Sequence, residues 1–393
     1  MKFPGKKIAY SAIATALALS LTACGSDSDS KKDDPVITPD DNDTVTVTGV
    51  TYGGDGATDG ETRYLADDAT YTNLFAHPVR TQAQIDAATE LTGDIDTNTT
   101  LSAGTLYYIH GLVTVKNNAV LTIPAGTVLF GKAGDDYLVI AKGSKIMAEG
   151  EVSNPIVFTS DTALLDPSDA DVGQWGGVTV LGNAPTNQTE TTYYEVDETN
   201  PDFVFGGTVS ADNSGILKNI YIYNSGETMG TDQEINGLSL AGVGSGTTVE
   251  NIHIENSSDD GIEIWGGTVN VTNATLVNCQ DDSFDLDFGW SGMATNIVVQ
   301  QTEAVHAGFE ISSGGTSPMT SGTIVNFIIN KDVDSDEGGI YIKDDTTAPT
   351  FINGYVRTYG TDAALYVKKV MTTTQKADIA FKDVILDATD IEE

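Results

Sequence analysis

The sequence predicts an all-β protein, a right-handed parallel β-helix with an N-terminal cap. Two regularities predict this solenoid. Six asparagines recur at intervals of roughly 22 to 32 residues, each followed three positions later by an aliphatic residue: Asn219, Asn251, Asn273, Asn296, Asn326 and Asn353. They lie in short runs of alternating apolar residues separated by Gly, Asn and Asp, a pattern typical of solenoid repeats. Because one repeat cannot bury its apolar face alone, the repeats are expected to stack, with their amides hydrogen-bonded along the axis.

Residues 1–23 are predicted to be a signal peptide. A lysine-containing start precedes the apolar stretch from Ile8 to Leu21, which is too short for a permanent membrane span. The ending Leu21-Thr22-Ala23-Cys24 resembles a bacterial lipoprotein signal. The resemblance implies that Cys24 is lipidated and anchors the chain to a membrane, and Gly25 after it favours the outer membrane. Which side of that membrane the protein faces is left open.

The rest of the chain divides into three expected regions. Residues 24–47 are polar and predict a flexible acidic tether. Residues 48–100 are irregular, include a possible short helix from Gln82 to Leu91, and predict a cap that covers the open end of the solenoid. Residues 101–393 are assigned to the β-helix, with stacking expected from about Leu106. Insertions at about 161–173, 183–212 and 225–233 are expected to leave one side as loops, where repeat proteins often bind their ligands.

The composition excludes some partners. The chain has 19 Lys and Arg against 57 Asp and Glu, a formal net charge of −38. Such a surface repels nucleic acid, so no nucleic-acid partner is expected. Cys279 is the only cysteine besides Cys24, which excludes an internal disulfide in the lipidated chain. No organic cofactor is expected, since the glycine-rich run at 242–246 has no P-loop lysine. The oligomeric state is left open.

A second strand of each repeat has the form apolar–x–apolar, and its middle residue is expected to face solvent. In chain order the middle residues are Val139, Thr179, Ser239, Glu263, Asp285, Glu310, Tyr341 and Tyr366. Two positions later the same face adds Trp265, Asp287, Ser312, Lys343 and Lys368. Because neighbouring rungs lie about 4.8 Å apart, three carboxylates are expected side by side on one open sheet.

The turns before these strands add further charge. Asp259-Asp260 and Asp281-Asp282 occupy equivalent positions in neighbouring repeats, and His306 precedes the next strand. Like charges stacked on neighbouring strands are destabilising, so they must be protonated, screened by salt or bound to a cation.

Several segments carry a family resemblance. The run LTIPAGTVLFGKAGDDYLVIAKGSKIMAEG, then WGGVTVLGNAP and CQDDSFDLDFGW, resemble a widespread group of exported bacterial proteins, often lipoproteins. The resemblance covers roughly residues 85–310. It implies a right-handed β-helix and a surface location, and it implies no particular activity.

Four interpretations of the acidic column remain open. Calcium is the one cofactor considered, because hard divalent ions prefer clustered carboxylates. Its expected ligands are Asp259, Asp281 and Asp287, with a separate loop at Asp332, Asp334 and Asp336. Carbohydrate binding is compatible with calcium, with sugars contacted by Trp265, Tyr341, Tyr366, Lys343 and Lys368. A plain solvated acidic face is the bland alternative.

Catalysis is the fourth interpretation. The Asp-Asp and His turns resemble those of polygalacturonases, but the glycines flanking the histidine and the Arg-x-Lys element of that family have no counterpart here. The catalytic residues would be Glu263, Asp285, Glu310, Asp260, Asp282 and His306, since glycoside hydrolysis needs two carboxyls roughly 5–10 Å apart. The favoured hypothesis is an outer-membrane lipoprotein acting as a calcium-dependent, glycan-directed binding or adhesion module. A polysaccharide-active hydrolase or lyase is the main alternative.

Overall fold

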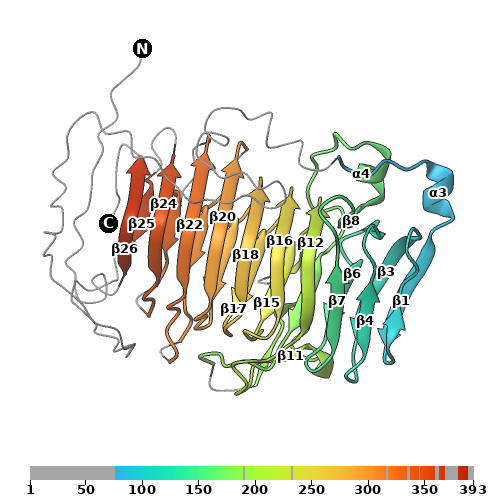
Figure 1. Cartoon of the computed structure of the whole chain (residues 1–393), viewed down its shortest axis with the longest axis horizontal. Helices are drawn as coiled ribbons and strands as arrows, with labels where there is room; N and C mark the ends of the chain where they lie inside the picture. Colours follow the sequence, from blue (N-terminus) through green and yellow to red (C-terminus); the bar gives the residue numbers. More distant parts are fainter. Residues whose placement is uncertain are drawn as a thin grey trace, which may run out of the picture.

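The computed structural model describes residues 76–188, 191–231, 233–303, 305–315, 317–333, 337–344, 346–358, 363–367 and 379–387. Within them the chain forms the predicted parallel β-helix. Its strands stack side by side along one long axis, from β1 (Thr89–Ile95) at one end to β26 (Ala380–Asp387) at the other (Figure 1). The expected signal peptide, Cys24, the tether and residues 48–75 lie outside the described residues. In the described part, no helix has the length and apolar character needed to cross a membrane.

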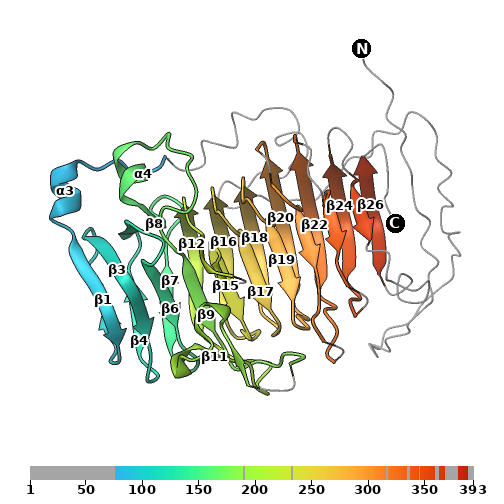
Figure 2. The ribbon, with the colours of Figure 1, turned by 180° about the vertical axis from the view of Figure 1, so that it is seen from behind.

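One face of the solenoid is built from short strands, and we call it the front sheet (Figure 2). After the second half of β3 (Leu106–Val115), its strands are β6 (Tyr137–Ile140), β9 (Val178–Leu181), β15 (Leu238–Ala241), β17 (Ile262–Trp265), β19 (Phe284–Asp287), β21 (Phe309–Ile311), β23 (Ile340–Ile342) and β25 (Leu365–Val367). Each pairs in parallel with the next, so the front sheet runs through nearly all the described rungs.

The other two faces are built from separate short strands at the N-terminal end and from long strands that cover both faces further along. At the N-terminal end these faces begin with β2 (Thr99–Thr100), β4 (Val120–Ile123), β5 (Val128–Gly131), β7 (Lys145–Glu149) and β8 (Ile156–Ser160). Further along, single strands cover both faces: β12 (Gly215–Tyr223), β16 (Thr248–Glu255), β18 (Asn270–Val277), β20 (Met293–Gln301), β22 (Thr323–Lys331) and β24 (Thr350–Arg357). Thus the first half of β12 pairs with β7 and its second half with β8.

The six recurring asparagines form the corners between these two faces. Their φ angles lie between 51° and 60°, the left-handed region that asparagine tolerates better than most residues. In five of them the side-chain Nδ2 donates to the Oδ1 of the preceding asparagine, over 2.7 to 3.1 Å, and the Nδ2 of the first, Asn219, donates to the carbonyl of Gly150. The predicted amide ladder is therefore confirmed.

The core is a set of stacked apolar columns. In the front sheet the residues on either side of each middle position point inward, and those of β17 and β19 are fully buried. Toward the C-terminal end the interior is aromatic, with consecutive ring centroids of Phe284, Phe309, Phe327 and Phe351 5.4 to 5.8 Å apart. Because the same positions are apolar in each rung, every rung buries its apolar side chains against those of its neighbours.

The N-terminal region differs from the expectation in two ways. The helix α3 spans only Gln82–Asp86, closed at its start by a capping box between Thr81 and Gln84. Stacking also begins before Leu106, because β1 already pairs in parallel with β3. The segment Thr89–Ile95 contains β-branched residues, which favour a strand. Its pairing with β3 therefore prevails over the weak helical pattern that the sequence shows up to Leu91.

The second and third insertions lie against the front sheet, whereas the helix of the first packs on β5 and β8. The first contains helix α4 (Asp161–Leu165), and the third is the hairpin of β13 (Glu227–Gly230) and β14 (Gln233–Ile235). The second contains the antiparallel pair β10 (Thr192–Tyr193) and β11 (Val204–Phe205) with two 3-10 turns, Glu195–Asp197 and Pro201–Phe203. Its aromatic residues pack onto the front sheet and form one buried cluster with Trp265.

Candidate functional site

The acidic column lies in the register that the sequence predicts. Glu263 is paired with Asp285 on the next strand, and Asp285 with Glu310 on the one after. Tyr341 and Tyr366 continue the same row. Three carboxylates therefore occupy one column on consecutive rungs of the front sheet.

The expectation that this column faces open solvent is wrong. Glu263, Asp285 and Glu310 are only 9%, 8% and 2% exposed. Tyr194 of the second insertion covers the neighbouring rungs, with its hydroxyl 3.4 Å from Ser239 Oγ and its ring 5.2 Å from that of Trp265. Burial raises the cost of every unneutralised charge in the column.

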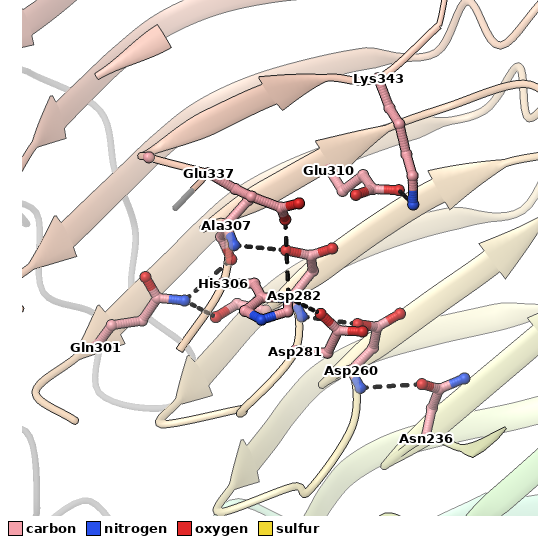
Figure 3. Close-up of polar contacts among 12 residues, drawn as sticks. Asn236, Asp260, Asp281, Asp282, Gln301, His306, Ala307, Glu310, Glu337 and Lys343 are labelled. Carbon is pink, nitrogen blue, oxygen red and sulfur yellow. Dashed lines mark hydrogen bonds and ion pairs between the residues drawn. The ribbon is translucent and has the colours of Figure 1, made fainter. Parts of the chain in front are cut away.

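The aspartates of the preceding turns form a second column, which is bonded to the backbone (Figure 3). The backbone N–H of Asp260 donates to Asn236 Oδ1 at 3.0 Å, and that of Asp282 donates to Asp260 Oδ1 at 2.8 Å. The N–H of Ala307 completes the series by donating to Asp282 Oδ1 at 2.6 Å. Each side-chain oxygen thus accepts a hydrogen bond from a backbone N–H in the turn of the next rung.

This ladder does not require a charge. Asn236 performs the same acceptor role as Asp260 and Asp282 with a neutral amide. Asparagine would serve at all three positions without placing like charges in a buried column. Closing the turns therefore does not account for the negative charge of the two carboxyl groups.

The two columns converge into three carboxylate triads. The triads are Asp259–Asp260–Asp281, Asp260–Glu263–Asp285 and Asp282–Glu310–Glu337, and in each the possible ligand oxygens lie within 4.8 Å of one another. Asp260 belongs to two of them, so the first two triads are contiguous. Oxygen atoms at this separation can surround a single hard cation.

The middle triad is the most enclosed and contains an unsatisfied oxygen. Asp285 Oδ1 is buried without a hydrogen-bond partner. Glu263 Oε2, in contrast, accepts a hydrogen bond from Asn236 Nδ2 at 2.6 Å. A buried carboxylate oxygen left without a donor is costly unless a proton or a cation occupies the site.

Protonation is the alternative to a cation. Burial raises the pKa of Asp259 to about 8, and the carboxylate of Asp281 contributes further. The pKa values of four more buried acids are raised well above their usual range by burial first and by neighbouring carboxylates second: Asp260, Glu263, Asp282 and Asp285. Without a cation, the cluster therefore retains protons at neutral pH.

His306 lies at the solvent-facing edge of the cluster. Its Nδ1 is 2.5 Å from Asp281 Oδ1 and 3.8 Å from Glu337 Oε2, and the hydrogen bond to Asp281 raises the pKa of the imidazole. Lys331, which is buried behind the turn, donates from Nζ to the carbonyls of His306 and Gly338. These contacts fix the two turns that carry His306 and Glu337.

Lys343 closes the column on the other side. Its Nζ is 2.7 Å from Glu310 Oε1. Although burial lowers the pKa of Lys343, the charge and hydrogen bond of Glu310 outweigh this and raise it. Lys343 therefore stays protonated, which argues against a role as a general base. Tyr341 and Tyr366 stack beside it with centroids 5.0 Å apart.

Two predicted residues lie apart from the triads. Burial raises the pKa of Asp287 to about 6, and one of its oxygens accepts from the N–H of Phe288 at 2.5 Å. Asp332 forms an ion pair of 3.0 Å with Arg357 rather than joining the acidic cluster. Asp334, Asp336 and Lys368 lie outside the described residues.

A cavity of about 680 Å³ adjoins the acidic column under the second insertion. Trp265, expected to stack on a sugar in the open, is 5% exposed and lines this cavity together with Phe288. The remaining walls come from the insertion.

Sequence reasoning missed Glu337 and the insertion residues. Glu337 stands three positions before Ile340, the same offset that relates Asp259, Asp281 and His306 to their strands, so the repeat pattern did contain a signal. The sequence contains no comparable signal for the packing of Tyr194 on the front sheet, because the packing of a loop leaves no periodic pattern.

A model of one protein family matches residues 93–393, and that family is described as the pectate-lyase-like β-helix domain. No curated protein and no solved structure matches the chain.

Proposed function

Since the chain belongs to the family of pectate-lyase-like β-helix domains, we propose that it is a calcium-dependent carbohydrate-binding module. The observation that carries the proposal is the set of three carboxylate triads, together with the unpartnered buried oxygen of Asp285. A divalent cation would neutralise the stacked charges and provide the missing partner for that oxygen.

The donor set favours calcium over a transition metal. All members of the triads are Asp or Glu, and no imidazole or thiolate takes part in them. Oxygen-only sites suit hard cations, and calcium accepts six to eight oxygens in flexible geometry. Each triad supplies three carboxylates and leaves the other positions to water or ligand hydroxyls.

The partner proposed for this site is a polysaccharide. Most triad side chains are too enclosed to contact a polymer, but three side chains are accessible: Asp281 of the first triad, and His306 and Lys343 beside the triads, are 44%, 55% and 48% exposed. Calcium would hold the triads in place while these groups bind hydroxyls. The lipoprotein-type sequence ending at Cys24 supports display of the module on an outer membrane.

One observation favours a second candidate function, a glycoside hydrolase. Burial raises the pKa of both Asp282 and Glu310, but the Lys343 ammonium opposes this rise at Glu310, whereas neighbouring carboxylates add to it at Asp282. Two carboxyls whose environments differ in this way can act as acid and base. A lyase using Lys343 as base is less well supported, because this lysine is protonated.

Calorimetric titration with calcium chloride tests the proposal. The mature chain with Cys24→Ser would be compared with a variant that also carries Glu263→Gln, Asp285→Asn and Glu310→Gln. A matched control carries Asp86→Asn, Glu149→Gln and Glu151→Gln, three exposed acids outside the cluster. We expect saturable binding in the parent and control and none in the cluster variant. No binding in the parent, or equal loss in both variants, would contradict the calcium site.

Retention of the protein in gels containing acidic or neutral polysaccharides tests the second half of the proposal. A binding module is retained with calcium and released by a chelator, and it leaves the polymer intact. Release of new reducing ends, abolished by Asp282→Asn or Glu310→Gln, would instead establish the hydrolase.

A further inference from the structure

The cavity under the second insertion has a composition distinct from that of the triads. Its volume of about 680 Å³ lies in the range that encloses a small organic ligand. The insertion contributes one wall, and Trp265 at the end of β17 and Phe288 directly after β19 contribute the other.

Aromatic side chains form much of the lining. Trp265 is central, with ring centroids 5.2 Å from Tyr194 and 6.2 Å from Phe205, and Phe205 in turn lies 6.5 Å from Phe288. Tyr193 also lines the cavity. Because Tyr194, Phe205 and Trp265 are themselves buried, the rings are held in place before any ligand arrives.

The polar part of the lining is acidic. Glu195 and Glu198 line the cavity, and Glu263 lies outside the lining, two positions before Trp265 on β17. None of the described residues that line the cavity is Lys, Arg or His. A carboxylate ligand such as a uronate would be repelled at this site, by these side chains and by the net charge of −38.

We propose that this cavity binds a small ligand that carries a positively charged ammonium group, such as an amino sugar or a quaternary amine. The faces of Trp, Tyr and Phe attract such cations, and desolvated sites strengthen the attraction. The carboxylates of Glu195 and Glu198 add charge complementarity. A hard inorganic cation would gain less here than in the triads, because half of the described lining residues are aromatic and neither Glu195 nor Glu198 belongs to a carboxylate triad. The inference goes beyond the calcium site and does not require a metal in the triads.

Binding is first measured on the mature Cys24→Ser chain by tryptophan fluorescence, with a chelator present. The chain has three tryptophans, and Trp175 and Trp290 are fully buried elsewhere, so a ligand in the cavity changes the emission of Trp265. The probes are glucosamine and choline, compared with N-acetylglucosamine, galacturonate and potassium chloride. We expect saturable changes with glucosamine, choline or both, and none with the three comparison solutes. Binding of choline alone assigns a quaternary amine, and binding of glucosamine alone assigns an amino sugar.

Two variants locate the site by calorimetry. Glu198→Gln and Trp265→Phe are each expected to weaken binding about five-fold or more, since they remove a charge and the best cation–π partner. Glu151→Gln removes an exposed charge outside the cavity and leaves affinity unchanged. Glu198 is exposed, so its variant should fold. Equal affinity for glucosamine and N-acetylglucosamine, or equal weakening by Glu151→Gln, would overturn the proposal, as would the absence of binding to either amine. Calcium binding by Glu198→Gln should match the parent, so this test and that of the triads fail independently.

Discussion

At the scale of single residues, Asp260 combines two roles that can be separated. Its Oδ1 accepts the N–H of Asp282, and its carboxylate belongs to two triads. The first role needs only an oxygen, as Asn236 shows on the preceding rung. The second needs a negative charge. Replacing the residue by asparagine or alanine therefore distinguishes the two roles.

We predict that Asp260→Asn keeps the metal-free stability of the parent at pH 8 or increases it, because the amide preserves the acceptor without the cost of holding a proton or a charge on a buried carboxyl. Asp260→Ala should lose about 1–3 kcal/mol, since the Asp282 N–H is left buried without a partner. Both variants should bind calcium more weakly. Urea unfolding with a chelator gives the stabilities, and calorimetry gives the affinities. If the asparagine variant is as unstable as the alanine variant, the ladder interpretation is wrong.

Most of the triad residues were predictable from the sequence because each sits at a fixed offset from an apolar–x–apolar strand. Glu263, Asp285 and Glu310 occupy the middle position, and the turn aspartates precede their strands by two or three residues. The protonation states were not predictable. They follow from burial, to which Tyr194, from an insertion that belongs to no repeat, contributes near Glu263.

At the scale of elements, the register of the solenoid depends on its corners. The left-handed asparagines let each long strand turn from one face to the next, and their amides join the six rungs from Asn219 to Asn353. This could be predicted, since the asparagine spacing is visible in the sequence. The shortened helix at Gln82–Asp86 could not, because pairing of Thr89–Ile95 with β3 is a long-range contact.

We predict that Asn273→Gly loses about 2 kcal/mol of stability, because it breaks the bonds with Asn251 and Asn296 and leaves both partly buried amides with one partner fewer. Asn273→Ala should lose about 1 kcal/mol more, since its φ of 59° strains a residue with a Cβ. The control is Asn117→Gly, at an exposed turn with a φ of 60°. Denaturant unfolding of the three variants decides the matter, and an unchanged midpoint for Asn273→Gly would show that the ladder contributes nothing.

At the scale of the whole molecule, the acidic cluster links stability to pH. A carboxyl whose pKa is raised on folding holds a proton in the native state at pH values where the unfolded chain has lost it. The stabilisation is full below the unfolded value of about 4 and is lost as pH rises through the folded value. For Asp259 that folded pKa is about 8, and for Asp287 about 6. The metal-free protein should therefore lose stability between about pH 4 and pH 8.

Calcium should reverse this trend, because it binds the ionised form and competes with protons. We predict that excess calcium raises the melting temperature more at pH 8 than at pH 5, where the carboxyls are still protonated. The variant with Glu263→Gln, Asp285→Asn and Glu310→Gln should melt with a flatter pH profile and a reduced calcium response. Scanning calorimetry across pH 4 to 8, with and without chelator, measures both effects. An equal shift at pH 5 and pH 8 would mean that calcium binds away from the buried acids. A metal-free protein that becomes more stable toward pH 8 would mean that the acids are ionised and neutralised by other groups.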